Sequence, residues 1–436
     1  MANVYERMFG LKPCVMAGNP YPTPLGGARL HPEVAEAMRE AAGYNIDMHQ
    51  LLERAGKKIA DMVGVEAAFI TSGACAGLTL AAAAVMTGPD VRLMEQLPDT
   101  EHPVNMKNEI IMQLGHFSHF AACLKASGAK IIEVGGGYLP RGRMAGATWE
   151  EFKESWETAQ DEGWLFHPLI YDETKKRYIR VFKVMGGHIE NAINERTAAI
   201  AYVRSTMSVR GEYEVSLDET IRIAKKYNLP VIVDFAAEAY KKSHLRMALE
   251  KGADLVIFSG GKDIRGPNDT GIVLGRKEWI EAVKLNSTPH YRIIVGRGFK
   301  VSKEQIVGLV AAMEKYLEID EGAEFKRDQD RCRYIASKFE GFPYVEASVY
   351  VPDYVPGGEI EGLFKFPVVH LKLDEKALGV KAADVAKLLW KGDPQINLNK
   401  QLVSWGIVEI MTHSLQDGDE DIVIERIKRI LSKNLK

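Results

Sequence analysis

Seven short apolar runs, several of them β-branched, recur through the first two thirds of the chain. Continuous apolar runs of four or five residues, rather than strict alternation, are typical of strands that are covered on both faces. Amphipathic stretches lie between several runs; Leu217–Tyr227, for example, ends at Asn228-Leu229-Pro230 before the next run. This alternation predicts a mostly parallel α/β sheet with crossover helices. The expected strands are Ala67–Thr71, Glu109–Met112, Lys130–Val134, Ala198–Val203, Pro230–Asp234, Asp254–Phe258 and Gly271–Leu274.

The pattern changes from about Glu281 onward, which predicts a second and smaller α+β domain. We expect an N-terminal arm at residues 1–30, a large domain at 31–285 and a small C-terminal domain at 286–436. Residues 138–183 are rich in Trp, Glu, Lys and Arg and have little strand signal, so we interpret them as an insertion or elaborated loop. The expected elements of the small domain are helices at Lys303–Leu317, Phe325–Phe339 and Glu420–Leu431, and strands at Tyr344–Val351 and Val368–Leu373.

The charge balance and the cysteines exclude several classes of protein. The 56 basic and 59 acidic side chains give a net charge of −3, which argues against a protein that coats nucleic acid. The four cysteines are far apart, without a C-x-x-C pair or a nearby histidine cluster, so we expect reduced thiols and no metal site. The N-terminus lacks the apolar segment of a secretory signal, and the longest apolar run, Leu78–Met86, is too short to cross a bilayer. We therefore expect a cytoplasmic protein.

The first chemical feature is the segment Thr71-Ser72-Gly73-Ala74-Cys75-Ala76-Gly77-Leu78, which directly follows a predicted strand. Small residues before an alanine-rich helix let backbone N–H groups approach an anion at the helix N-terminus, and Ser72 adds a hydroxyl. An ordinary βα turn with a serine N-cap gives the same pattern. The segment lacks the Gly-Lys-Ser/Thr of a Walker A loop and the spacing of a dinucleotide-binding loop.

The second feature is Asp234, at the carboxyl end of the run Val231-Ile232-Val233. Ligands bind at this edge of an open α/β sheet, and a carboxylate buried there needs a cation or several hydrogen-bond donors. A helix-capping aspartate remains the alternative.

The third feature is Lys262, within Phe258-Ser259-Gly260-Gly261-Lys262-Asp263-Ile264-Arg265-Gly266-Pro267. A lysine beside glycines at the end of a buried strand lies at the ligand-binding edge, where desolvation would free its amine to form a Schiff base with an aldehyde. A lysine that only holds an anion is the alternative. Thr270, just before the next predicted strand, could supply a hydroxyl to the same anion.

Pyridoxal 5′-phosphate needs the three parts that these features supply together. They are an anion site for the phosphate, a carboxylate for the protonated pyridine nitrogen, and an amine for the aldehyde. A flat side chain on the ring face would complete the site, and His116 is the candidate, although a core or surface histidine is a serious alternative.

Longer segments of the sequence resemble a known family. TSGACAGL, VDFAAE and, most specifically, FSGGKDIRGPNDTGIVLGRKEWI are similar to the selenocysteine synthase (L-seryl-tRNA(Sec) selenium transferase)-like branch of fold-type I pyridoxal-phosphate enzymes, which also contains D-glucosaminate-6-phosphate ammonia-lyase-like proteins. The resemblance extends over nearly the whole chain, from Pro24-Leu25-Gly26-Gly27 to Leu415-Gln416-Asp417-Gly418-Asp419-Glu420.

The resemblance implies roles for individual residues. Lys262 would form the internal aldimine, Asp234 would pair with the pyridine nitrogen, and His116 would stack on the ring. The family fold implies a homodimer or higher homo-oligomer with active sites at subunit interfaces, so Thr270 could serve the neighbouring subunit's cofactor. The expected phosphate ligands are Ser72, Gly73, Ala74 and Ser259, and the candidate substrate-binding residues are Arg265 and Arg297, although Arg297 could equally be structural.

The expected function is that of a pyridoxal-phosphate-dependent lyase that catalyses α,β-elimination on a small amino acid or amino sugar acid. Bacterial selenocysteine synthases carry an extra N-terminal tRNA-binding domain, whereas the family-like region here begins within the first thirty residues. We therefore rank selenium transfer on seryl-tRNA second. Aldol cleavage, racemisation and transamination stay open, because the same bound substrate can enter each of them. A non-catalytic pyridoxal-phosphate-binding protein is a further alternative, and an NAD-dependent oxidoreductase fits less well because the glycine fingerprint is missing.

Overall fold

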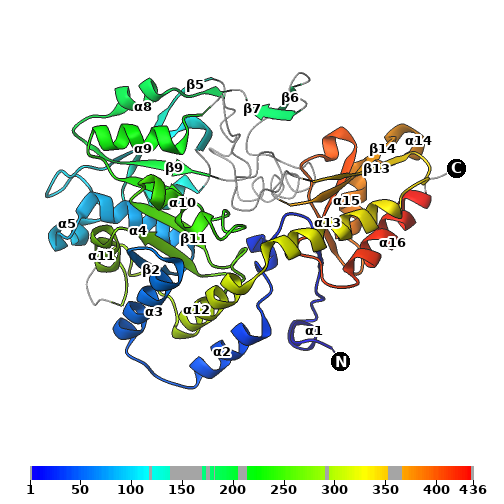
Figure 1. The fold of residues 1–436 in the computed structure, drawn as a ribbon, viewed down its shortest axis with the longest axis horizontal. Coiled ribbons are helices and arrows are strands. Elements are labelled where there is room, and N and C mark those ends of the chain that lie inside the picture. The colour runs from blue at the N-terminus through cyan, green and yellow to red at the C-terminus, as the bar shows by residue number, and fades with distance from the viewer. Residues whose placement is uncertain are drawn as a thin grey trace. The chain divides into compact units, whose positions relative to one another are not determined.

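The computed structural model describes residues 2–116, 120–137, 169–172, 177–180, 182–204, 214–289, 294–351 and 366–433 (Figure 1). These residues form two compact units. The large unit contains the described residues between 23 and 319, and the small unit contains residues 2–22 together with residues 320–351 and 366–433.

A seven-stranded sheet forms the centre of the large unit, in the order β2-β12-β11-β10-β9-β3-β4. All neighbouring pairs are parallel except those that involve β12, which runs antiparallel to both β11 and β2. The expected fold class, a mostly parallel seven-stranded α/β sheet, is therefore confirmed, and each of the seven expected strands is present. Their bounds are β2 (Ala67–Thr71), β3 (Glu109–Gln113), β4 (Lys130–Val134), β9 (Thr197–Val203), β10 (Val231–Asp234), β11 (Leu255–Ser259) and β12 (Gly271–Gly275).

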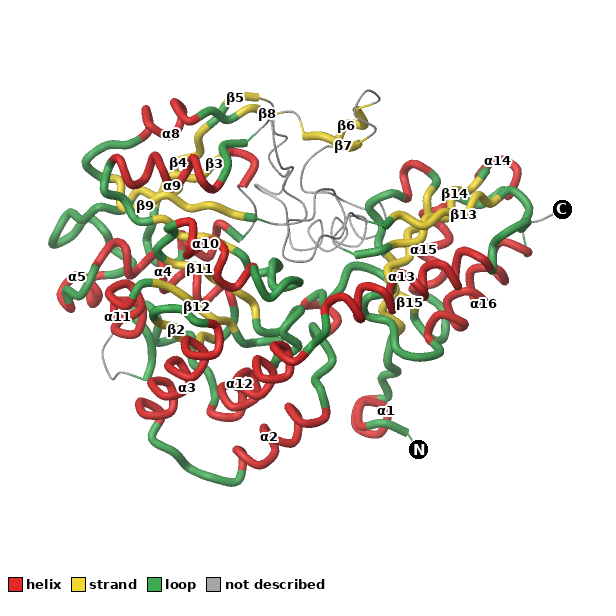
Figure 2. Tube along the Cα trace, in the orientation of Figure 1, coloured by secondary structure: helices red, strands yellow, loops and turns green. Residues whose placement is uncertain are grey.

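Helices cover the sheet, as Figure 2 shows by the red segments around the yellow strands. Helix α4 (Ala74–Thr87) is apolar on all sides and packs across β2, β11 and β12. A Cβ at Gly77 would lie 3.1 Å from the side chains of Ile257 and Val273, so the small residues of α4 allow a very close approach to the strands. By contrast, α9 (Leu217–Lys226) is amphipathic and begins at Ser216, whose hydroxyl accepts the N–H of Glu219.

The other elements of the large unit surround this arrangement. Asp47 caps the start of α3, and Ser302 and Gln305 form a capping box at the start of α12. The helices are α2 (Pro32–Ala42), α3 (Met48–Val63), α5 (Val91–Gln96), α6 (Ala121–Lys125), α8 (Gly186–Ala192), α10 (His244–Lys251), α11 (Lys277–Leu285) and α12 (Lys303–Glu318), with 3-10 turns η1 (Thr23–Leu25) and η2 (Leu114–His116). Two further strand pairs are β5 (Gly136–Gly137) with β8 (Phe182–Lys183), and β6 (Leu169–Asp172) with β7 (Arg177–Arg180).

The small unit has its own sheets and its own hydrophobic core. An antiparallel sheet has the order β13-β14-β16, and a parallel pair joins β1 to β15, so Val15–Ala17 near the N-terminus pairs with Ile396–Leu398 near the C-terminus. The strands are β1 (Val15–Ala17), β13 (Val345–Tyr350), β14 (Val368–Leu373), β15 (Ile396–Leu398) and β16 (Ile407–Met411); the helices are α1 (Val4–Phe9), α13 (Glu321–Ser337), α14 (Glu375–Leu378), α15 (Ala382–Trp390), α16 (Asp419–Ser432) and the 3-10 turn η3 (Val403–Trp405).

The compact units do not by themselves define folding domains, so the domain limits expected from the sequence stay a prediction. Helix α12, which follows the expected boundary at residues 285 and 286, packs against α2 and α3 of the large unit. Most of the expected insertion at residues 138–183 lies outside the described residues. Within the described ranges, no helix combines the length and the apolar character needed to cross a membrane.

The close approach of β12 to the loop after β2 generates a prediction about stability. A Cβ at Gly271 would lie 2.5 Å from the carbonyl carbon of Gly73, a contact that only a backbone shift could relieve. We expect Gly271→Ala to lower the free energy of unfolding by about 1–3 kcal/mol, the usual cost of overpacking. Gly187→Ala in α8 is the matched control, since a Cβ there has no neighbour within 4 Å. Equal melting temperatures for the two variants would contradict this expectation.

Candidate active site

The three features singled out in the sequence follow strands that lie side by side. In the register of the sheet, Thr71 pairs with Gly271, and Gly271 pairs with Ser259. The next strand follows directly, because Asp234 pairs with Ile257. The segments that begin at Ser72, Ser259 and Asp234 therefore leave one edge of the sheet next to each other.

The loop Ser72–Ala74, called the anion loop below, connects β2 to the N-terminus of α4. Gly73 has φ +105°, a conformation that side-chain-bearing residues rarely adopt. The hydroxyl of Thr71 donates a hydrogen bond of 2.9 Å to the carbonyl of Gly73, which fixes the turn. The first backbone N–H groups of a helix have no partner within the helix, so this terminus suits an anion. Ser72 is half-buried beside it.

Lys262 lies in a tight turn between β11 and β12, called the lysine loop below (residues 259–270). Backbone hydrogen bonds of 2.8 Å close this loop, from the N–H of Gly260 to Thr270 and from the N–H of Gly266 to Gly260. The N-terminal glycine segment packs against it, since the N–H of Ala28 donates to the carbonyl of Gly261 at 3.0 Å. The Lys262 side chain is half-buried, which differs from an ordinary solvated surface lysine.

The carboxylate of Asp234 is buried, with 7% of the residue exposed. One of its oxygens, Oδ1, accepts the backbone N–H of Ala236 at 3.0 Å. Burial raises the pKa of Asp234, while the Ala236 hydrogen bond and the positive charge of Lys262 oppose this rise. Lys262 and Asp234 therefore interact electrostatically, although they come from different loops.

His116 is also buried, and both of its ring nitrogens have partners. The backbone N–H of Val203 donates to Nδ1 at 3.2 Å, and Nε2 lies 2.9 Å from Oε2 of Glu214. Because Nδ1 accepts a hydrogen bond from Val203, we assign the ring hydrogen to Nε2, which then donates a hydrogen bond to Glu214. The edge of the ring packs against Tyr202 with a centroid distance of 4.5 Å and an angle of 78°.

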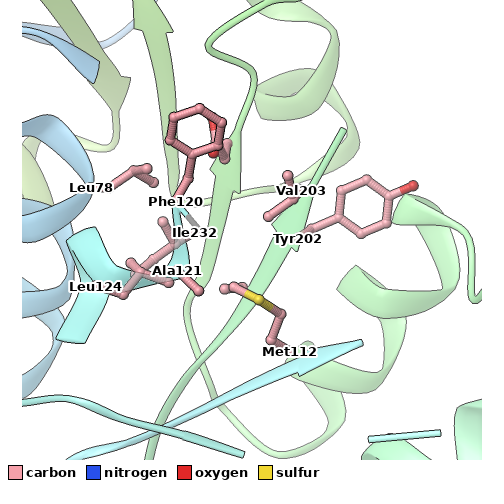
Figure 3. A pocket seen from close by; sticks show the side chains of 10 residues that line it. Leu78, Met112, Phe120, Ala121, Leu124, Tyr202, Val203 and Ile232 are labelled. Atoms are coloured by element: carbon pink, nitrogen blue, oxygen red, sulfur yellow. The ribbon is translucent and has the colours of Figure 1, made fainter. Parts of the chain in front are cut away.

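A small pocket lies beside Asp234 (Figure 3). Figure 3 shows Phe120 and Val203 around it, with the ring of Tyr202 pointing away. His116 is not among the described residues that line this pocket, so its stacking on a cofactor ring stays a prediction, and Phe120 is a second aromatic candidate. The lining residues are Leu78, Met112, Phe120, Ala121, Leu124, Ala201, Tyr202, Val203, Ile232 and Asp234.

Thr270, Arg265 and Arg297 lie in three different settings. The hydroxyl of Thr270 is fully buried and donates to the carbonyl of Pro267 at 2.6 Å, within the lysine loop. Arg265 is half-buried in the same loop and has φ +56°. Arg297 is exposed in a turn before α12. Their predicted roles in cofactor and substrate binding stay predictions.

A buried ion pair that was not predicted from the sequence lies next to Asp234. Nε of Arg204 lies 3.3 Å from Oε2 of Glu238, and their side chains are only 8% and 0% exposed. The backbone N–H of Arg204 donates a hydrogen bond of 3.1 Å to the backbone carbonyl of Asp234. Arg204 directly follows the apolar run of β9. A search for polar residues at the carboxyl ends of apolar runs, which identified Asp234, could therefore have identified Arg204 as well. Among the described residues, no cluster of three or more His, Cys, Asp or Glu side chains could hold a metal ion.

Comparisons with known proteins agree with this geometry. Residues 184–326 match the family model of L-seryl-tRNA selenium transferase. The chain is 30% identical to a 5'-C-glycyluridine monooxygenase-decarboxylase of a Streptomyces species, over 94% of this chain and 88% of that protein. It is 28% identical to the D-glucosaminate-6-phosphate ammonia lyase of Salmonella typhimurium, over 98% of each chain. The solved structure of a D-glucosaminate-6-phosphate ammonia-lyase matches with a TM-score of 0.76 at 26% identity, over the full length of both chains.

The fold and these matches define a pyridoxal-phosphate enzyme of fold type I. Within that class, the chain belongs to the family that contains the L-seryl-tRNA selenium transferases and the D-glucosaminate-6-phosphate ammonia-lyases. The resemblance described from the sequence is thus confirmed. The ammonia-lyase relatives support the expected lyase, and the selenium transferase match keeps the transferase alternative.

The buried carboxylate generates a prediction about stability and pH. Asp234→Asn keeps an oxygen for the Ala236 N–H but removes the buried charge, so without added cofactor we expect the free energy of unfolding at neutral pH to rise by about 1 kcal/mol. A raised pKa in the folded protein means that the carboxylate costs stability above that pKa. The difference between variant and wild type should therefore shrink as the pH falls through the folded pKa towards the unfolded value of about 3.9.

Denaturant titrations over a range of pH measure this difference. Asp61→Asn, at an exposed position paired with Lys57, is the matched control and should change stability by a few tenths of a kcal/mol at most. A less stable Asp234→Asn variant, or a difference that does not vary with pH, would contradict the prediction.

Proposed function

We propose that the chain is a pyridoxal-phosphate-dependent lyase that catalyses α,β-elimination, of the ammonia-lyase or dehydratase type, on a small amino acid or amino sugar acid. The observation that carries this proposal is the pairing of a half-buried lysine in a closed loop with a buried carboxylate on the adjacent strand. The match to an ammonia lyase over 98% of both chains supports the reaction class.

The residues present fit the cofactor in three respects. Asp234 is a buried carboxylate whose described hydrogen bond uses Oδ1, and such a group suits the protonated nitrogen of a heterocycle. The anion loop offers N–H groups at a helix N-terminus for a phosphate. Lys262 would hold the aldehyde carbon, while Ser72 and Ser259 would add hydroxyl groups beside the phosphate.

When bound, the cofactor supplies an electron-accepting ring to which an electron pair from the substrate Cα can delocalise. The chain's own residues supply the rest. Lys262 is the candidate base that would remove the α-proton of the substrate. Asp234 would keep the ring nitrogen of the bound cofactor protonated. Loss of a β-hydroxyl group as water, followed by hydrolysis, converts the substrate into a 2-oxo acid and ammonia.

Recognition of the substrate is assigned to arginine side chains. Arg265 lies in the lysine loop itself, and Arg297 is exposed before α12. A guanidinium group binds a carboxylate or a phosphate with two parallel hydrogen bonds. We assign Arg297 to the substrate carboxylate and Arg265 to a further acidic group.

We also propose a cytoplasmic homodimer or higher homo-oligomer that acts on a small molecule and not on nucleic acid. The family resemblance supports the assembly, and it assigns Thr270 to the neighbouring subunit's cofactor. The net charge of −3 supports a substrate other than nucleic acid.

Selenium transfer on seryl-tRNA is the second candidate, and the match of residues 184–326 to the selenium transferase family favours it. A gel-shift titration with that tRNA separates the two candidates, because the lyase should not bind it specifically. The relative named as a monooxygenase-decarboxylase adds a third outcome, which uptake of dioxygen and release of carbon dioxide would reveal.

The cofactor assignment has a direct chemical test. The protein is incubated with pyridoxal 5′-phosphate and reduced with borohydride, which makes the lysine–cofactor bond permanent, and the peptides are identified by mass spectrometry. We expect the label on Lys262, no label at that position in Lys262→Ala, and no change in Lys300→Ala, where the lysine is exposed. Labelling spread over surface lysines without Lys262 would refute the site.

The reaction assignment is tested separately, with the same cofactor-loaded protein. Release of ammonia and of 2-oxo acid is followed over a panel of 3-hydroxy amino acids and amino sugar acids, with and without a phosphate group. For the best substrate, we expect Lys262→Ala to lower kcat by about 10²–10⁴-fold, the usual contribution of a general base. A correctly labelled protein that releases neither product from any member of the panel would refute the lyase and leave the cofactor site standing.

A further inference from the structure

Two cysteines that are far apart in the sequence meet beside the anion loop. Cys75 is the second residue of α4, and Cys123 lies in α6, which packs against α4. The hydroxyl oxygen of Thr79 lies 3.1 Å from the carbonyl oxygen of Cys75 and 2.6 Å from that of Cys123. One atom is thus within hydrogen-bond distance of both cysteine backbones.

The two thiols also act on each other electrostatically, and they are not equivalent. Cys75 is exposed, whereas Cys123 is half-buried. The interaction with the Cys123 side chain lowers the pKa of Cys75 to about 7. The same interaction raises the pKa of Cys123 far above its ordinary value. Cys75 is therefore the nucleophilic thiolate of the pair, and Cys123 is the proton donor.

Charged groups from two further elements act on Cys75. The Asp234 carboxylate at the end of β10 raises its pKa, and Lys262 in the lysine loop lowers it. The other two cysteines lack this combination of features. Cys332 is buried, which raises the pKa of its thiol to about 12, and it contacts the hydroxyl of Thr412. Cys14 is half-buried in the small unit.

We propose that Cys75 and Cys123 form a reversible oxidation site, in which a peroxide converts the two thiols into an intramolecular disulfide. The Cys75 thiolate attacks the peroxide O–O bond, gains one oxygen as a sulfenic acid and releases hydroxide. The sulfur of Cys123 then attacks the Cys75 sulfur, the S–O bond breaks, and water leaves with the Cys123 proton. The peroxide is reduced, and the two thiols together lose two electrons.

The position of the pair makes this second step favourable. The packing of α6 on α4 and the bridge through Thr79 hold Cys123 beside Cys75, so a local side-chain adjustment would bring the two sulfur atoms to a covalent S–S distance of about 2 Å. The exposed member reacts first, and the half-buried member lies next to it. This site does not depend on the proposed lyase function, because neither thiol takes part in that chemistry.

Peroxide titration of the full-length protein tests the proposal. We expect a non-reducing digest to contain a linked pair of Cys75 and Cys123 peptides, an intact mass lower by two hydrogen atoms, and restoration by a thiol reductant. In Cys123→Ser, Cys75 has no partner thiol and should proceed to the sulfinic and sulfonic acids, which the reductant does not restore. Cys14→Ser is the matched control and should form the link as the wild type does.

Two outcomes would overturn the proposal. One is a wild-type protein in which Cys75 accumulates as sulfinic acid without any linked peptide. The other is a protein in which Cys14 or Cys332 oxidises before Cys75. Because the wild type alone distinguishes these outcomes, the test does not depend on the folding of a variant.

Alkylation by iodoacetamide gives an independent measure of the Cys75–Cys123 contact. The rate at Cys75 should follow an apparent pKa near 7 in the wild type and shift to higher pH in Cys123→Ala, which cannot donate a hydrogen bond. At pH 7 a lower pKa gives Cys75 a larger thiolate fraction, which speeds alkylation, but it also makes that thiolate a weaker nucleophile. Together these two effects predict an alkylation rate at Cys75 about threefold above that of an ordinary cysteine. An unchanged pH profile in Cys123→Ala would show that the two thiols do not interact.

Discussion

The adjacency of four strand ends, β2, β12, β11 and β10, is the constraint on which the site depends. The register places Thr71, Gly271 and Ser259 in one row, and Asp234 follows on the next strand. Because β12 runs antiparallel, it returns the chain from the lysine loop to the sheet next to the anion loop. Parallel strands need long crossovers between them, so this one antiparallel strand lets a short loop carry Lys262 back over the same edge. The close contact between Gly271 and Gly73 is a consequence of that return.

Much of this arrangement could be predicted from the sequence, because it follows from local patterns. Apolar runs predicted the seven strands of the sheet to within one residue at each end. Asp234 was recognised as the polar residue that ends one of these runs. Glycines beside Lys262 at the end of a buried run indicated a lysine at the ligand-binding edge of the sheet. Each of these signals lies within about ten residues of the feature that it predicts. The topology then brings the features together, as a doubly wound sheet does at the carboxyl ends of its strands.

Other parts of the site depend on contacts between distant residues, which no local pattern records. Glu214 holds His116 from 98 positions away, and the Arg204–Glu238 pair becomes visible only when β9 and β10 are placed side by side. Val15–Ala17 pairs with β15 near the other end of the chain. The four cysteines looked unremarkable for the same reason, since only the packing of α6 on α4 brings Cys123 to Cys75.

The thiol pair and the candidate active site share their electrostatics. Asp234 and Lys262 act on Cys75 with opposite signs, and interactions between charges are reciprocal. A change in the charge of the Lys262 nitrogen must therefore alter the thiolate fraction of Cys75, and loss of the Cys75 charge on oxidation must alter the balance between Lys262 and Asp234. Loss of a negative charge near Asp234 favours its carboxylate form, which is the form that a protonated ring nitrogen requires. The proposed oxidation of the pair would thereby be coupled to the protonation of the groups that the proposed chemistry uses.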